Sequence, residues 1–214
     1  MASKPASPVS SSRTAKTAAL IVVDVQNDFA DPAGSLFVSG GPAALPQVNL
    51  AIDAARAAGA LVVYTQDWHP AHTPHFAPDG GIWPVHCVAD SWGAALHRDL
   101  RPGPDVLIQK GAHGEDGYSG FFMRDSATGA TVPTPLDGIL RQHQIETVLV
   151  CGLATDYCVK ATALDAATLG YFTFLEIPAI AAVNLAAGDG DRAIAEMLKA
   201  GVRLIDQVRP APAR

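Results

Sequence analysis

The chain has 214 residues, nearly half of them hydrophobic (49%), which predicts one globular domain with a sizeable core. Its formal net charge of −6 and the absence of a lysine or arginine run argue against a nucleic-acid partner. No stretch of the sequence approaches the roughly 18 uninterrupted apolar residues of a membrane span, so no membrane partner is expected.

The two ends of the chain differ from the rest in composition. Residues 1–17 are rich in Ser, Ala, Pro and Lys, lack the apolar segment of a signal peptide, and are predicted to be a flexible tail. Residues 209–214 are interpreted in the same way, which leaves a single domain over 18–208. Three cysteines do not make a disulfide framework, and a reducing, cytoplasmic location fits them better.

Apolar runs and helical periodicity alternate along the chain. In chain order they predict a strand over 19–25, a helix over 46–58, strands over 60–65 and 105–109, a helix over 136–143, a strand over 147–151, a helix over 159–169, a strand over 171–175, a helix over 192–200 and a strand over 202–205. This pattern predicts an α/β fold with three layers, α/β/α: a mostly parallel six-stranded sheet with helices on both faces. The segments 68–104 and 111–135 are too long to be plain connections, and long loops are usually functional.

One cysteine occupies a special position. Cys158 lies at the turn between the strand over 147–151 and the helix that follows, where Thr155 or Asp156 can cap the helix. The N–H groups and positive dipole at the start of that helix favour the thiolate, which is the nucleophilic form. The alternative interpretation of a lone cysteine is a buried, inert thiol.

Other chemically active side chains also follow strands. Asp24 comes after the first strand, Asp67 and His69 after the second, and Lys110 after the third. Since the carboxyl ends of parallel strands meet at one edge of the sheet, Asp24, Lys110 and Cys158 are expected to converge there. A carboxylate can take the proton of a thiol, and an ammonium stabilises the thiolate. Taken singly, Asp24 could be a turn residue and Lys110 a solvated lysine.

A cluster of histidines follows the second strand. Asp67 and His69 are two residues apart and can bind one ion from an extended backbone, and His86 can complete the site. Two histidines and a carboxylate with open positions suit Zn²⁺ or Fe²⁺, and His72 and His75 compete for a fourth place. The alternative is a set of surface loop histidines. Cys87 can be a soft ligand, a packed thiol or, less in keeping with a cytoplasmic protein, a disulfide partner of Cys158.

Several aromatic residues lie in the segments that follow strand ends. These residues, Phe29, Trp68, Trp83, Tyr118 and Phe121, can be core beneath long loops or walls of a pocket. A flat apolar slot with few polar groups is what a small aromatic ligand requires.

Together these residues resemble the nicotinamidase/pyrazinamidase family within the isochorismatase-like cysteine hydrolases. The resemblance covers about residues 18–205. It rests on Asp24 to Phe29 with Gly34-Ser35-Leu36, on Asp67-Trp68-His69-Pro70, on Trp83-Pro84-Val85-His86-Cys87, on Lys110-Gly111 with Tyr118 to Phe121, and on Gly152 to Val159. Asp24, Lys110 and Cys158 mark the superfamily, whereas the Asp-x-His and Trp-Pro-x-His-Cys motifs are typical of its metal-dependent amidases.

The resemblance implies a role for each of these residues. Cys158 is the nucleophile, Asp24 its base and Lys110 their charged partner. The Leu153–Ala154 peptide is expected to be cis, which aims the Ala154 N–H, with that of Cys158, into an oxyanion hole.

The resemblance also implies where a metal ion and a substrate bind. One divalent metal ion, zinc or iron, is expected on Asp67, His69 and His86, with His75, before Phe76, in the place of a fourth ligand that some members carry. Substrate contacts fall to Phe29, Leu36, Trp83, Tyr118 and Leu153, with Phe29 and Trp83 sandwiching the ring. The loop over 111–117 varies in length and sequence among members, and the polar segment 124–132 has no assigned role.

The activity expected from the resemblance is hydrolysis of nicotinamide to nicotinate and ammonia through a cysteine thioester, with pyrazinamide as a further substrate and NAD salvage as the context. The partner is then a small aromatic carboxamide, and a homo-oligomer is left open. The alternatives are a metal-free relative that acts on another amide or a vinyl ether, and a catalytically dead metal-binding module.

Overall fold

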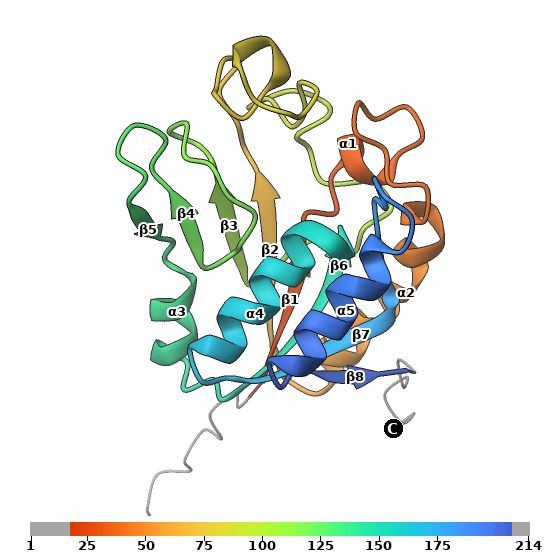
Figure 1. Cartoon of the computed structure of the whole chain (residues 1–214). Helices are drawn as coiled ribbons and strands as arrows, with labels where there is room; N and C mark the ends of the chain where they lie inside the picture. Colours follow the sequence, from red (N-terminus) through yellow and green to blue (C-terminus); the bar gives the residue numbers. More distant parts are fainter. Residues whose placement is uncertain (1–17, 207–214) are drawn as a thin grey trace, which may run out of the picture.

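The computed structural model describes residues 18–206, and the two tails predicted from sequence lie outside these residues. A six-stranded sheet forms its centre (Figure 1). Its strands are β1 (Ala18–Val23), β2 (Leu61–Asp67), β3 (Val106–Lys110), β6 (Thr147–Leu153), β7 (Phe172–Ala181) and β8 (Arg203–Ile205). Their order is β3-β2-β1-β6-β7-β8, and every neighbouring pair is parallel.

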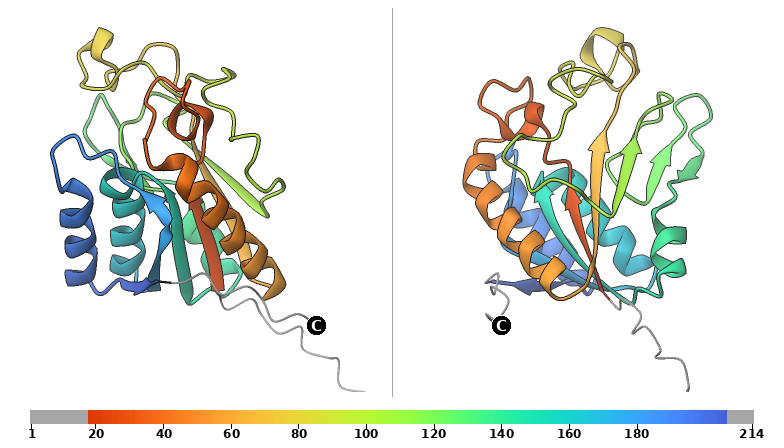
Figure 2. Two further views of the ribbon diagram at one scale, coloured as in Figure 1. Left: turned by 90° about the vertical axis from the view of Figure 1, so that its right-hand side faces the viewer. Right: turned by 180° about the vertical axis from the view of Figure 1, so that it is seen from behind.

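Helices cover both faces of this sheet (Figure 2). Helix α2 (Gly41–Ala57) packs on one face, and α3 (Leu136–Gln142), α4 (Lys160–Thr168) and α5 (Asp189–Lys199) pack on the other. Strand β1 joins the two cores, because Ala19, Ile21 and Val23 point to one face while Leu20 and Val22 point to the other. The predicted three-layer α/β/α fold is confirmed.

Two predicted boundaries are wrong for reasons connected with proline. Helix α2 begins at Gly41 rather than at Pro46, so Pro46 lies inside it and removes one backbone hydrogen bond without ending the helix. Strand β7 extends to Ala181, beyond the predicted end at Leu175. The register between β7 and β6 is irregular between Leu175 and Ile180. Pro178 lies in this irregular stretch of β7, where its missing N–H does not interrupt the regular ladder of hydrogen bonds.

Several short elements, among them one helix and two strands, were not predicted. Helix α1 (Asn27–Ala30) follows β1, and β4 (Phe122–Arg124) pairs with β5 (Thr131–Pro133) in an antiparallel hairpin. The hairpin lies beside the β3 edge of the sheet (Figures 1 and 2). It accounts for the polar segment 124–132, which runs from the end of β4 through the turn into β5. Within residues 18–206, no helix has the length and apolar character that crossing a membrane requires.

Candidate active site

The strand order delivers the expected residues to one place. Asp24 directly follows β1, Asp67 ends β2 and Lys110 ends β3, and Asp67 and Lys110 are direct partners in the ladder. On the other side of β1, strand β6 leads into the turn that carries Cys158. The convergence predicted from the parallel sheet is therefore present.

Lys110 is the centre of this group. Its side chain is buried, and its Nζ lies 2.8 Å from Oδ2 of Asp24, contacts Oδ1 of Asp67, and lies 3.7 Å from Sγ of Cys158. Burial alone would lower the pKa of Lys110, but the charges of Asp24 and Asp67 outweigh it and raise that pKa well above its usual range. The ammonium therefore stays charged and holds both carboxylates near the thiol.

The two carboxyl groups are electrostatically different. Burial raises the pKa of Asp67, but the Lys110 ammonium and the neighbouring histidines outweigh burial and lower it to about 2. Burial also raises the pKa of Asp24; Lys110 opposes the rise and the Asp67 charge adds to it, so that the pKa is above its usual value. Two carboxyl groups with separated pKa values take separate roles, and Asp24 is the one suited to accept a proton.

Cys158 needs such a base. Burial raises the pKa of its thiol well above the usual range, against the opposing charge of Lys110. Burial thus acts against the thiolate that the start of the helix is expected to favour.

The turn around Cys158 differs from the expected capped helix. Residues Thr155–Val159 form a π-helical turn before α4, and the carbonyl of Ala154 accepts hydrogen bonds from the N–H groups of Tyr157 and Val159. Neither Thr155 nor Asp156 caps the helix; the Asp156 carboxylate instead accepts hydrogen bonds from the N–H groups of Val183 and Asn184. The cap prediction is wrong because these N–H groups after β7 are the partners of Asp156.

The backbone that leads into this turn is tightly constrained. The peptide between Leu153 and Ala154 is cis, as predicted. Gly152 has φ +108°, and a Cβ there would lie 2.1 Å from the carbonyl oxygen of Val23 on the neighbouring strand. Only glycine allows β6 to approach β1 this closely next to the turn that carries Cys158.

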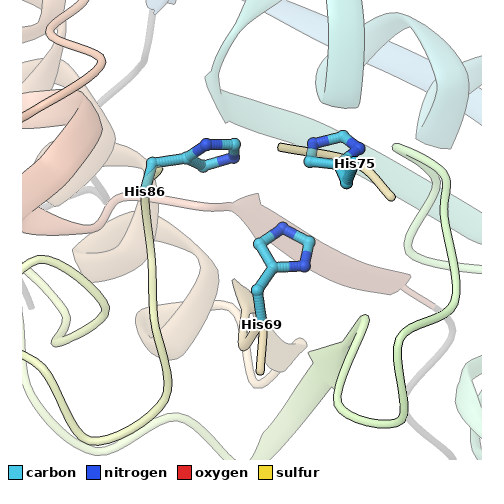
Figure 3. Close-up of side chains that lie close together, drawn as sticks. All are labelled: His69, His75 and His86. Atoms are coloured by element: carbon cyan, nitrogen blue, oxygen red, sulfur yellow. The ribbon is translucent and has the colours of Figure 1, made fainter. Parts of the chain in front are cut away.

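Three histidines form a second cluster beside the first. His69, His75 and His86 are all buried, and one ring nitrogen of each lies within 4.8 Å of the others. Figure 3 shows the three rings facing a common point. Nδ1 of His86 lies 2.7 Å from the carbonyl oxygen of Pro84, and Nδ1 of His75 lies 2.7 Å from Oδ1 of Asp116. These partners leave Nε2 of both rings free for an ion.

His69 gives the strongest indication that the cluster binds a metal. Both of its buried ring nitrogens lack a hydrogen-bond partner among the described residues. A buried polar group without a partner is costly, and an ion bound to the ring removes that cost. Burial lowers the pKa of His69 to about 4 and also lowers that of His86, so both rings are in the neutral form that ligates metal. The residues present therefore fit a divalent metal ion.

Asp67 lies between the two clusters. Its Oδ1 contacts Lys110, and its Oδ2 lies 3.9 Å from Nε2 of His69. By distance it groups with Asp24 and Cys158 rather than with the three histidines. The Asp67 carboxylate thus faces Lys110 with one oxygen and the histidine cluster with the other.

The competition between His72 and His75 has a clear result. The side chain of His72 is 88% exposed and faces Asp79, whereas His75 is buried in the cluster.

Cys87 is a free, buried thiol, and so are Cys151 and Cys158, which excludes the Cys87–Cys158 disulfide. The packed-thiol interpretation of Cys87 is therefore confirmed.

A pocket joins the two clusters. It holds about 390 Å³ of empty space, a figure that includes space open to solvent. Its wall includes all the side chains predicted to contact substrate, namely Phe29, Leu36, Trp83, Tyr118 and Leu153, together with Cys158, Ala154, Asp67, His75 and His86. The Tyr118 hydroxyl accepts a hydrogen bond of 3.0 Å from Nε1 of Trp83, which fixes both rings. Trp68 and Phe121 pack against the core instead.

Sequence reasoning missed several supporting residues. Tyr157, Val38 and Val183 also line the pocket, and Tyr157 packs edge-on against Trp83. Thr65 donates a hydrogen bond of 2.6 Å to Oδ1 of Asp24, and the side chain of Gln26 binds both the N–H and the carbonyl of Asp67. Tyr157 and Gln26 lie within the motifs already singled out, but the sequence carries no signal for Thr65.

A thiol with a carboxylate and a lysine beside it, at the carboxyl edge of a parallel sheet, defines a cysteine hydrolase of the α/β class. The isochorismatase domain family matches residues 18–208, and the chain belongs to this family. The match spans all the residues that the structure describes and so includes every site residue named above.

Within the family, the chain is similar to nicotinamidases and pyrazinamidases. It is 38% identical over 203 residues to the nicotinamidase of Escherichia coli, an alignment that covers 87% of this chain and 93% of the relative. The crystal structure of Pyrococcus horikoshii pyrazinamidase in complex with zinc has a TM-score of 0.79 and 39% identity, and covers 89% of this chain and 99% of its own. A structure from L. infantum in complex with nicotinate has a TM-score of 0.80 and 39% identity over 89% of this chain and 93% of its own.

Proposed function

We propose that this protein is a metal-dependent nicotinamidase, which hydrolyses nicotinamide, and also pyrazinamide, to the carboxylic acid and ammonia. The observation that carries the proposal is that Cys158, His75 and His86 line one pocket. A flat carboxamide can present its amide to the thiol while its ring reaches the histidine cluster. The product of such a reaction feeds NAD salvage.

The first half of the reaction forms a thioester. Asp24 takes the proton of the Cys158 thiol, and the thiolate sulfur attacks the carboxamide carbon. The N–H groups of Ala154 and Cys158 would stabilise the negative oxygen of the tetrahedral intermediate. The C–N bond then breaks, and the proton on Asp24 passes to the nitrogen, which leaves as ammonia.

The second half regenerates the enzyme. Asp24, again unprotonated, takes a proton from a water molecule, whose oxygen attacks the thioester carbon. The C–S bond breaks, the proton returns to the sulfur, and the acid leaves. Lys110 holds the Asp24 carboxylate in place throughout and balances the negative charge that passes from carboxylate to sulfur.

The ring of the substrate would lie between Phe29 and Trp83, both on the pocket wall. His69, His75 and His86, with Oδ2 of Asp67, would hold the divalent ion, and this donor set suits zinc or iron. When bound, the ion supplies a Lewis-acidic docking point for the ring nitrogen of the substrate. A cytoplasmic location is in keeping with three free cysteines.

The test measures ammonia release from nicotinamide, pyrazinamide and benzamide, of which benzamide lacks the ring nitrogen. Each substrate is given to enzyme stripped of metal and to the same enzyme reconstituted with zinc or iron. We expect ammonia from the first two substrates only with metal restored, and at least tenfold slower release from benzamide. The absence of ammonia from nicotinamide with metal restored would contradict the proposed substrate. Full activity in stripped enzyme would favour a metal-free relative.

A further inference from the structure

His75 is held from outside the histidine cluster by a charged side chain. Its Nδ1 lies 2.7 Å from Oδ1 of Asp116, whose Oδ2 lies 2.6 Å from Nη2 of Arg124. His75 is buried, Asp116 is partly buried and Arg124 is mostly exposed. A chain of two short charged contacts therefore runs from the surface to the cluster.

The backbone fixes this chain of contacts. The N–H of Asp116 donates to the carbonyl of Arg124 at 2.8 Å, and the N–H of Arg124 donates to the carbonyl of Asp116 at 2.6 Å. Arg124 ends strand β4, where it pairs with Thr131 of β5. Asp116 is thus bound to the β4–β5 hairpin by its main chain and by its carboxylate.

The three histidines differ in what orients them. Nδ1 of His86 faces the carbonyl oxygen of Pro84, an uncharged acceptor, and neither ring nitrogen of His69 has a hydrogen-bond partner among residues 18–206. A carboxylate can only accept, so the proton between His75 and Asp116 belongs to Nδ1 and leaves the Nε2 lone pair free. Such a partner also makes the imidazole a stronger ligand.

We propose that Asp116, held in place by Arg124 and the β4–β5 hairpin, is a positioning residue that orients His75 toward the metal ion and strengthens its binding. This inference rests on the proposed metal site. It gives the polar segment 124–132 a role, because the hairpin becomes a support of the metal site although it does not line the histidine cluster itself.

The test measures metal binding directly. Zinc affinity is determined by competition with a chromophoric chelator, and the cobalt-substituted protein is examined by visible absorption. We expect Asp116→Ala to bind zinc about 10–100-fold more weakly and to shift the cobalt bands. Asp116→Asn, which keeps an acceptor but loses the charge, should fall between Asp116→Ala and wild type.

The matched control is Asp53→Ala. Asp53 lies on the surface of α2 and, like Asp116, forms an ion pair with an arginine, Arg101. The zinc affinity and cobalt spectrum of Asp53→Ala should equal those of wild type. If Asp116→Ala does not fold, Arg124→Met serves in its place. Arg124 is mostly exposed, so its replacement should not disturb folding, and without its guanidinium the Asp116 carboxylate is free to rotate. The zinc affinity of Arg124→Met should lie below that of wild type.

Two outcomes would count against the inference in distinguishable ways. Wild-type zinc affinity and an unchanged cobalt spectrum in Asp116→Ala would overturn the role of Asp116 alone. If wild-type protein binds no metal, or if His69→Ala binds it as tightly as wild type, the proposed metal site fails, and the role of Asp116 fails with it.

Discussion

The Lys110 ammonium lies 2.8 Å from the Asp24 carboxylate in a fully buried ion pair. The same ammonium lies 3.7 Å from Sγ of Cys158, so the proposed base and nucleophile share one cation. This arrangement keeps a negative charge stable in the protein interior whether it resides on oxygen or on sulfur. It allows a proton to move between Asp24 and Cys158 without a change in the total charge of the site.

Replacement of Asp24 tests its role as the base. Asp24→Asn keeps the shape of the side chain but cannot take the thiol proton, and the thiol has its pKa raised by burial. We expect kcat to fall by about 10²–10⁴-fold, the usual contribution of a general base. Steady-state ammonia release at saturating nicotinamide measures the effect, and a kcat within threefold of wild type would refute the assignment.

Replacement of Lys110 tests the ion pair itself. Lys110→Met leaves two buried carboxyl groups without their cation, and breaking a buried pair in this way costs about 3–5 kcal/mol. We expect the free energy of unfolding, measured with urea, to fall by that amount, and activity to be lost. The control is Lys160→Met, which removes a more exposed lysine paired with Glu196; it should change stability by less than about 1 kcal/mol.

Metal removal should lower stability as well as activity. An ion that binds only the folded state stabilises it by about 2.7 kcal/mol at a free concentration 100 times its Kd. Calorimetry should therefore give a lower Tm after chelation, restored by adding zinc or iron. His69→Ala should have a Tm that metal does not raise, and a metal-dependent Tm in that variant would place the ion elsewhere.

Much of the site followed from the order of strands. Asp24, Lys110 and Cys158 could be grouped in advance because parallel strands place their carboxyl ends on one edge, whatever their separation in sequence. His75 could be preferred over His72 only through the family resemblance. Spacing alone does not say which of two loop histidines turns inward, since that depends on how the loop over 68–104 folds.

Other features could not be predicted because they depend on contacts distant in sequence. Asp116 is an ordinary acidic residue in a variable loop until the β4–β5 hairpin brings Arg124 beside it. Asp156 suits a helix cap, but two N–H groups after β7 bind it instead. The raised pKa of Cys158 likewise reflects burial, which local sequence does not specify.

Glu176 on β7 gives a pH prediction away from the active site. It is buried, its Oε2 has no hydrogen-bond partner among the described residues, and burial raises its pKa from 4.5 to about 7. The folded protein therefore holds this proton more tightly than the unfolded chain. Its contribution to stability is complete below about pH 4.5 and is lost as pH rises to about 7.

The variant Glu176→Gln removes this dependence. We expect it to match wild type near pH 5 and to be more stable at pH 8 by up to about 3 kcal/mol, since one pKa unit corresponds to about 1.4 kcal/mol. Urea unfolding at both values measures the difference. Glu196→Gln, at an exposed position on α5, is the control, and an equal pH profile for Glu176→Gln and wild type would contradict the prediction.

The most direct test is ammonia release from nicotinamide by metal-loaded wild type, Cys158→Ala and Cys151→Ala. Cys151 is also a buried thiol, but it lies within β6 and does not line the pocket. We predict ammonia from wild type and Cys151→Ala and none above background from Cys158→Ala, with metal content unchanged. Ammonia release from Cys158→Ala at the wild-type rate would contradict nucleophilic catalysis by this cysteine.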